Sequence, residues 1–174
     1  MSFTKVDPFN YLVEFNQKLK TGGLLLVSEG LDKIPNAMTI GWGFLGTMWS
    51  LPVIVVAVRH SRHTYKLLEE SDSFTVCIPS NEMNNILESC GSKSGRTHDK
   101  FAELNLTAKK SENIGAPYIE ECPIFFECTI IFKADLSEGK LDPIITEKAY
   151  KSGDLHMLYF GEIKGAYVID DYKN

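Results

Sequence analysis

The chain has 174 residues, 44% hydrophobic and 24% charged, which predicts a single soluble domain over residues 1–174 that buries a sizeable core. A formal net charge of −5 argues against a broad phosphate-backbone footprint, so nucleic acid is not an expected partner. No apolar run approaches the roughly 20 residues of a membrane span, and the first residues do not read as a secretory signal. We therefore expect a cytoplasmic protein without a membrane partner.

Cysteine and histidine usage bears on redox compartment and metal binding. The chain carries four cysteines, Cys77, Cys90, Cys122 and Cys128. They form no Cys-x-x-Cys pair and are too few to staple a domain of this size, which favours reduced thiols. The close histidines His60 and His63 have no cysteine or carboxylate nearby at ligand spacing, so no metal site is expected.

The N-terminal part of the chain predicts one helix and then three strands. Asp7 caps the helix, Pro8 takes its first position, and the glycines at 22–23 end it. Apolar runs bounded by Gly or Pro predict the strands, and a loop separates the last two. The strands cover residues 24–28, 38–44 and 53–58, with the loop at 45–51. The last strand, rich in β-branched residues, stops at Arg59.

The second half predicts short helices between longer strands. Ser61 or Thr64 caps a helix running to about residue 71. Two further helices are predicted over residues 84–89 and 99–104, and Gly91 ends the first of them in a left-handed conformation. Strands are predicted over residues 73–78, 124–135 and 155–169, with a polar connection over 136–153.

The order of these elements indicates the fold class. About six strands with short helices between some of them show no regular βαβ rhythm, which favours a mainly β fold over a doubly wound sheet. We expect a closed antiparallel β-barrel with peripheral helices. No Gly-x-Gly-x-x-Gly follows a strand, so a Rossmann cofactor site is not supported.

Two polar clusters indicate an anion site. Residues 93–96 combine two cations with a serine and a glycine, which lets backbone amides approach an anion, although a solvated basic loop has the same composition. The second cluster, residues 59–64, lies where a buried strand gives way to a helix. Its alternative interpretation is a helix cap whose arginines reach solvent.

A third cluster indicates a pocket for a planar ring. Residues 36–39 read Asn-Ala-Met-Thr, and Trp42 and Trp49 follow closely. Short polar groups and backbone amides suit the edge of a heterocycle, and an indole suits its face. Core packing is the alternative for both tryptophans and is the favoured interpretation for Trp42.

The three clusters, taken in order, resemble a known family. The chain reads Asn-Ala-Met-Thr, then Trp49 with Pro52 before a Val/Ile strand, then Arg-x-Ser-Arg-x-Thr-Tyr from Arg59. It continues with Cys-Gly-x-Lys-Ser-Gly-Arg-x-x-Asp-Lys-Phe from Cys90 and ends with His-Met-Leu-Tyr-Phe-Gly-Glu-Ile from His156. This order resembles the flavin reductase-like, FMN-binding split β-barrel family, most closely its flavoredoxin branch, over roughly residues 20 to 168.

The resemblance implies an antiparallel split barrel of Greek-key type with bound FMN. By resemblance, residues 36–39 contact the isoalloxazine ring, and Thr39 is the candidate at the edge where the hydride is accepted. The residues implied to bind the cofactor are Asn36, Ala37, Met38, Thr39, Trp49, Arg59, Ser61, Arg62, Thr64, Ser94, Gly95, Arg96 and Lys100. His156 and Tyr159 match more weakly, with a barrel-lining role as the alternative.

The family resemblance also implies a function, for which alternatives stay open. An FMN enzyme of this kind passes electrons from NAD(P)H to a flavin, a protein partner or a small acceptor, and the flavin supplies the redox chemistry without a catalytic dyad. A homodimer with the flavin near the subunit interface is implied too. A non-enzymatic FMN protein for electron transfer, storage or redox sensing is one alternative. A β-barrel module binding another phosphorylated ligand is a second.

Overall fold

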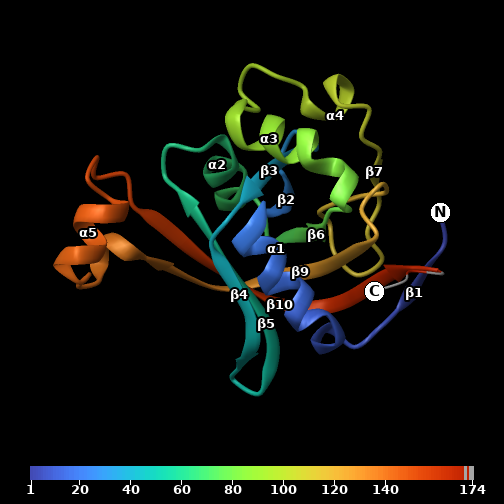
Figure 1. The fold of residues 1–174 in the computed structure, drawn as a ribbon, viewed down its shortest axis with the longest axis horizontal. Helices are drawn as coiled ribbons and strands as arrows, with labels where there is room; N and C mark the ends of the chain where they lie inside the picture. Colours follow the sequence, from blue (N-terminus) through green and yellow to red (C-terminus); the bar gives the residue numbers. More distant parts are fainter. Residues whose placement is uncertain (171, 173–174) are drawn as a thin grey trace.

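The structure is a computed structural model that describes residues 1–170 and 172. It is mainly β, with one large antiparallel sheet and helices packed around it (Figure 1). The sheet strands are β1 Phe3–Lys5, β2 Leu24–Glu29, β3 Pro35–Ile40, β4 Gly43–Met48, β5 Leu51–Arg59, β6 Ser73–Ile78, β9 Ile124–Asp135 and β10 His156–Ile169. They follow the order β3-β2-β6-β9-β10-β5-β4, and β1 pairs with β10.

Short elements complete the fold. A separate two-stranded ladder joins β7 Ala108–Lys109 to β8 Tyr118–Ile119. The helices are η1 Pro8–Tyr11, α1 Leu12–Thr21, α2 His63–Glu69, η2 Asn81–Met83, α3 Asn84–Ser92, α4 Lys100–Glu103, η3 Leu136–Glu138 and α5 Pro143–Ala149. No helix in the described part of the chain is long and apolar enough to cross a membrane.

The ladder of the large sheet is open, whereas the sequence predicted a closed barrel. Within the described residues, β3 pairs only with β2, and β4 pairs only with β5. These two edge strands are joined by Gly41 and Trp42 alone. Such a link spans at most about 10 Å, so the sheet has to roll until its two edges come close. No hydrogen-bonded ladder pairs β3 with β4 in the described chain, and the backbone of Gly41 and Trp42 connects them instead.

The structure confirms the predicted strands with one exception, which concerns where a strand begins and ends. The predicted strand 38–44 divides into β3 and β4, and the predicted loop 45–51 is wrong. Its residues form a tight hairpin between β4 and β5, with Trp49 and Ser50 at φ of 53° and 59° at the turn. Positive φ at both central residues is characteristic of a type I′ turn, whose backbone twist matches the right-handed twist of the two strands. The signal was missed because neither residue is a glycine.

Three helix details differ from the sequence-based expectations. Arg62 occupies the N-cap of α2 without a side-chain cap bond, so neither Ser61 nor Thr64 caps it. Gly91 lies inside α3, which ends at Ser92, and is not a left-handed terminator. The connection over residues 136–153 contains the unpredicted helix α5, which Asp142 caps by accepting from the Ile144 amide. Asp7 and Asp99 cap η1 and α4, and both positions match the predicted helix starts.

The strand β2 separates two apolar layers. Leu24 and Leu26 belong to the larger cluster, which includes Phe15 of α1, whereas Leu25 and Val27 belong to a second cluster with residues of α3 and α4. Side chains alternate across a strand, so this division places core on both faces of the sheet. These four residues are 0% exposed, so the layers cover this stretch of β2 completely on both faces.

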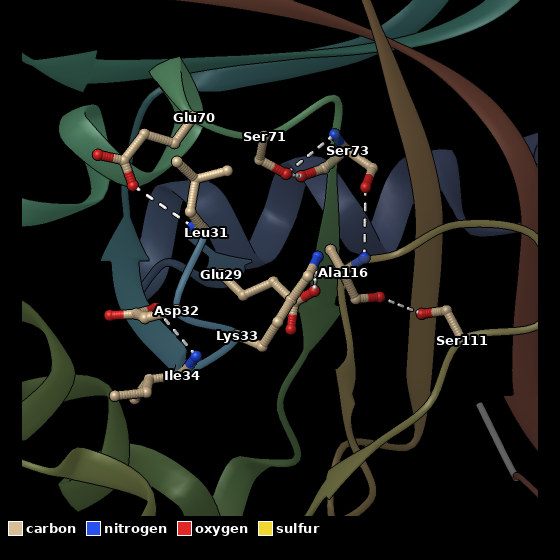
Figure 2. A network of polar contacts seen from close by, with 10 residues as sticks. All are labelled: Glu29, Leu31, Asp32, Lys33, Ile34, Glu70, Ser71, Ser73, Ser111 and Ala116. Carbon is tan, nitrogen blue, oxygen red and sulfur yellow. Dashed lines mark hydrogen bonds and ion pairs between the residues drawn. The ribbon is translucent and has the colours of Figure 1, made fainter.

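Polar contacts hold the turn between β2 and β3 (Figure 2). The Leu31 amide donates to the Glu70 carboxylate at 3.4 Å, and the Ile34 amide donates to Asp32 at 3.1 Å. The Lys33 ammonium lies 2.9 Å from the Glu29 carboxylate across the same turn. These contacts set where β3 starts, and with it the position of the polar residues that follow Pro35.

Candidate functional site

Three segments far apart in the sequence converge on a small hollow of about 130 Å³, the first hollow. Asn36 and Met38 of β3 form one wall, and residues 61–64 at the start of α2 form the next. Residues 90–96, at the end of α3 and in the loop after it, form a third wall with Lys100 of α4. The two predicted anion loops therefore do lie opposite each other.

Hydrogen bonds and close packing hold these walls together. The Asn36 amide donates to the Thr64 hydroxyl at 2.9 Å, and both residues are buried. The Arg96 guanidinium donates to the Ser61 carbonyl at 3.0 Å, which joins the two loops directly. A Cβ on Gly95 would lie 2.2 Å from the side-chain Oδ1 of Asn36, so the loop backbone can approach this close only at a glycine.

The first hollow gathers four cations with different environments. Lys93 is paired with Glu103 at 2.7 Å, whereas Arg62 and Arg96 are exposed. Lys100 is only 4% exposed, and no ion pair among the described residues includes it. Its ammonium has two long contacts, 3.5 Å to the Cys90 carbonyl and 3.4 Å to the Lys93 carbonyl.

The environment of Lys100 disfavours its charge. Burial lowers the pKa of the Lys100 ammonium, and the positive charge of Arg62 lowers that pKa as well. A buried ammonium without a counter-ion costs several kcal/mol of folding free energy. An anion entering the first hollow would remove much of that cost.

His63 shares this environment. Its Nδ1 atom is buried and has no hydrogen-bond partner among the described residues. Burial lowers the pKa of His63, and the charges of Arg96 and Lys100 lower it further, so the imidazole is neutral at pH 7. The first hollow is thus lined by positively charged side chains and by polar groups that lack hydrogen-bond partners, and no carboxylate is among its described lining residues.

A second hollow of about 180 Å³ adjoins the first. It is lined by residues 38–42 together with Ala57, Arg59, Arg62, Gly91 and His156. Met38, Arg62 and Gly91 line both hollows, so the two are contiguous. Two guanidinium groups, one imidazole and backbone atoms line this space, and one wall is a partly exposed indole.

The indole belongs to Trp42, which is 46% exposed and is not the core residue that the sequence favoured. Its ring lies 4.8 Å from the His156 ring and 5.9 Å from the Tyr150 ring, centroid to centroid. The Arg59 guanidinium lies 5.8 Å from the Trp42 ring and 5.3 Å from the Tyr150 ring. Aromatic faces and a cation in this arrangement attract one another and keep the wall in place.

The structure brings most of the predicted site residues to these hollows. Those that line the first are Asn36, Met38, Ser61, Arg62, Thr64, Ser94, Gly95, Arg96 and Lys100. Thr39 and Arg59 line the second. The Thr39 hydroxyl donates to the Leu87 carbonyl of α3 at 2.6 Å, which orients this side chain.

Two predicted residues lie elsewhere, and Arg59 has a different set of contacts from those expected. Ala37 is fully buried in the layer beneath α3. Trp49 stands on the β4–β5 turn, 54% exposed, against Phe132 and Phe160. Arg59 donates to the carbonyls of Ala149 and Asp154 and does not line the first hollow.

Two residues that the sequence did not single out lie at the hollows: His63 lines the first, and Tyr150 contacts residues that line the second. His63 lies between two chosen positions, and the Arg-His-Ser-Arg-His-Thr run was its available signal. Tyr150, whose hydroxyl lies 2.8 Å from Nδ1 of His156, has no local sequence signal because it ends a helix that was not predicted.

Comparisons with known proteins bear on this site. The sequence model of a family described as "Flavin reductase like domain" matches residues 17–174. A protein of Archaeoglobus fulgidus is 30% identical over 152 residues, which cover 87% of this chain and 73% of that protein. No function is given in the name of that relative.

Two solved structures share the fold. Flavoredoxin of Desulfovibrio vulgaris aligns with a TM-score of 0.70 and 28% identity over 86% of this chain and 70% of that chain. An FMN-binding domain of a flavin reductase-like enzyme from Shewanella baltica aligns with a TM-score of 0.66 and 19% identity, over 96% of this chain and 77% of that chain.

Proposed function

We propose that this chain, which belongs to the flavin reductase-like domain family, binds FMN and passes electrons from NAD(P)H through it to a flavin, protein or small-molecule acceptor. The observation that carries the proposal is the buried ammonium of Lys100, which lacks a counter-ion among the described residues, between two exposed arginines. A phosphate dianion supplies that counter-ion, and Arg and Lys bind it through charge-assisted hydrogen bonds.

The two contiguous hollows suit the two ends of FMN. The phosphate end fits the first hollow, where Ser94, Gly95 and Arg96 face residues 61–64 and Lys100 lies at the base. The ring end fits the second, where Thr39 and the backbone of residues 38–41 offer hydrogen bonds and Trp42 offers an apolar face. When bound, the flavin supplies the redox chemistry, and the protein binds and orients it.

An absorbance experiment tests the cofactor and the reaction together. Purified protein, saturated with FMN and freed of excess, is expected to show bound flavin bands that NADH or NADPH bleaches in a stopped-flow mixer. Protein that retains no flavin would rule out the proposal. Retained flavin that neither nicotinamide reduces would leave binding intact and favour the non-enzymatic alternative. Arg96→Ala is expected to weaken FMN retention, because its guanidinium joins the two phosphate-side loops.

We also propose that the rolled sheet is the split barrel of this family and that two copies associate. An exposed apolar face supports association: Phe44, Met48 and Trp49 of the β4–β5 hairpin adjoin Ile131 and Phe132 of β9, each 38–54% exposed. Trp49, absent from both hollows, would then lie at the interface. A monomer in sedimentation velocity at micromolar concentration would contradict this. A crystal structure in which β3 and β4 diverge from each other beyond the Gly41–Trp42 link would contradict the barrel.

The four cysteines are all free and buried, which supports the cytoplasmic location that we propose. Export of the chain in a cell-fractionation experiment would contradict it.

A further inference from the structure

The connection between β9 and β10, residues 136–155, forms an arm that carries α5 and extends from the sheet (Figure 1). Its base is tied to the rim of the second hollow. The Arg59 guanidinium donates to the carbonyls of Ala149 and Asp154, and the Ser61 hydroxyl donates to the Asp154 carboxylate at 2.7 Å. Arg59, implied by the family resemblance to bind the cofactor, thus holds the arm.

These ties place Tyr150 behind the second hollow, against Trp42, Arg59 and His156, which line it. It follows α5 directly and is only 6% exposed, with its ring against Trp42 and under the Arg59 guanidinium. Its hydroxyl lies 2.8 Å from Nδ1 of His156 and has no other hydrogen-bond partner among the described residues. Packing accounts for an aromatic ring at position 150, but it does not account for the hydroxyl group on that ring.

The hydroxyl determines which nitrogen of His156 carries the proton. Burial raises the pKa of the Tyr150 phenol, and burial together with the charge of Arg59 lowers the pKa of His156 to about 4, so both are neutral at pH 7. A neutral imidazole has one N–H. The distance alone fits either direction, but the phenol O–H has no other acceptor among the described residues. Donation from the phenol to Nδ1 leaves no buried donor unpaired and puts the imidazole proton on Nε2, which makes no hydrogen bond to any described residue.

We propose that Tyr150 is a positioning residue that holds His156 with its Nε2–H presented to the second hollow, where it donates to an electron-rich carbonyl oxygen of a planar conjugated ring. The proposal rests on the FMN-binding function above and specifies how that site recognises its ligand. Arg59 and Arg62 line the same hollow and favour an oxygen that gathers negative charge. Two rings carry such an oxygen: the flavin, on its pyrimidine edge, and the nicotinamide, on its carboxamide.

Tyr150→Phe tests this, because it keeps the ring on Trp42 and removes only the O–H. Loss of one oriented hydrogen bond corresponds to about a tenfold effect. If the oxygen belongs to the flavin, a redox titration of the FMN-loaded variant will show the reduced form bound about tenfold less tightly relative to the oxidised form, a midpoint about 30 mV lower. If it belongs to nicotinamide, the midpoint will stay and the KM for NADH will rise about tenfold at unchanged kcat.

Tyr65→Phe is the matched control, since the Tyr65 ring lies 5.0 Å from the His60 ring and neither residue lines a hollow. It is expected to change neither readout. His156→Gln presents an amide N–H that does not depend on Tyr150, so adding Tyr150→Phe to it is expected to have no further effect. An equal effect of Tyr150→Phe in both backgrounds would show that the hydroxyl acts on the fold alone and would overturn the proposal.

The outcomes separate this inference from the function beneath it. Wild-type values of midpoint and KM in Tyr150→Phe would overturn the role of Tyr150 while FMN binding stands. A wild-type protein that binds no FMN would overturn both. Should Tyr150→Phe fail to fold, His156→Gln and His156→Ala decide: the amide donor is expected to retain the wild-type readout that alanine loses, and equal readouts would overturn the proposal.

Discussion

The two hollows share three residues yet are built in different ways. The first is made of charge: cations from short loops meet there, and the arrangement is costly until an anion arrives. The second combines the Trp42 indole and the His156 imidazole with two arginines, and the hydrogen bonds that join Arg59 and His156 to the arm are already made. Under the proposed function, affinity and chemistry are divided: the first hollow would supply binding free energy, and the second would orient the ring.

The largest expected effect concerns Lys100 in the first hollow. Lys100→Met is expected to weaken FMN binding about 100-fold, within the range for losing one partner of a buried charge pair. The same change removes an uncompensated buried ammonium, so the unfolding free energy of the FMN-free protein is expected to rise. Flavin fluorescence quenching measures the FMN affinity, and urea denaturation measures the unfolding free energy. A variant that loses affinity while it gains stability identifies Lys100 as a ligand-binding cation and not a structural one.

The exposed arm residue Lys140 supplies the control for that experiment. Lys140→Met is expected to leave FMN affinity and stability unchanged. Should Lys100→Met reduce the stability of the FMN-free protein and leave affinity intact, the first hollow would not be a phosphate site, and the contrast between the hollows would fail.

A smaller effect is expected at Gly95. Its Cβ would lie 2.2 Å from Asn36 Oδ1 and 2.8 Å from His63 Cδ2, so Gly95→Ala must displace the loop that carries Arg96. We expect about tenfold weaker FMN binding from the misplaced donors. Gly139→Ala is the control, because the added methyl meets only the Leu136 carbonyl at 3.7 Å. Equal FMN affinity in the two variants, measured by fluorescence titration, would contradict the close approach.

Thr39 tests the boundary between the hollows with an effect of a few-fold. Thr39→Val keeps the shape of the side chain and removes the hydroxyl that donates to the Leu87 carbonyl at 2.6 Å. One lost hydrogen bond is expected to raise the Kd for FMN by about threefold to tenfold, with a shift of the bound flavin spectrum. An unshifted spectrum would place the ring away from β3.

The smallest effect concerns pH. Burial and the Arg59 charge lower the pKa of His156 from the ordinary 6.5 to about 4, so the unfolded chain binds a proton between these values that the folded protein does not. Stability attributable to His156 is therefore full above about pH 6.5 and is lost as pH falls toward 4. Denaturation midpoints at pH 7 and pH 4.5 are expected to differ less in His156→Gln. Identical differences would show that groups other than His156 set the dependence.

Sequence patterns predicted the strands well where apolar residues were continuous. Residues 73–78 and 124–135 are rich in β-branched and aromatic residues, and their bounds match β6 and β9. The β4–β5 hairpin was missed because Trp49 and Ser50 adopt positive φ without glycine. The helix α5 was missed because its surroundings are polar and it buries no residue of its own.

The candidate site was predictable in type and only partly in geometry. Composition indicates an anion site at residues 93–96 and 59–64, because cations, glycine and hydroxyl groups gather there. Composition could not show that the Arg59 guanidinium bonds to the arm while Arg62 lines the first hollow, since the two arginines lie only three positions apart on one short segment. That choice depends on where the Ala149 carbonyl lies in space.

The sequence by itself therefore determined which groups are present: the strands, the family, and the Lys-Ser-Gly-Arg and Asn-Ala-Met-Thr motifs. Local chemistry is enough for this, because propensity and composition act over a few residues. Only the tertiary structure decided that the sheet rolls through Gly41 and Trp42, that Lys100 is buried without a counter-ion in the described chain, and that Tyr150 reaches His156. Burial and long-range contact set charge and tautomer, and neither is a property of a short segment.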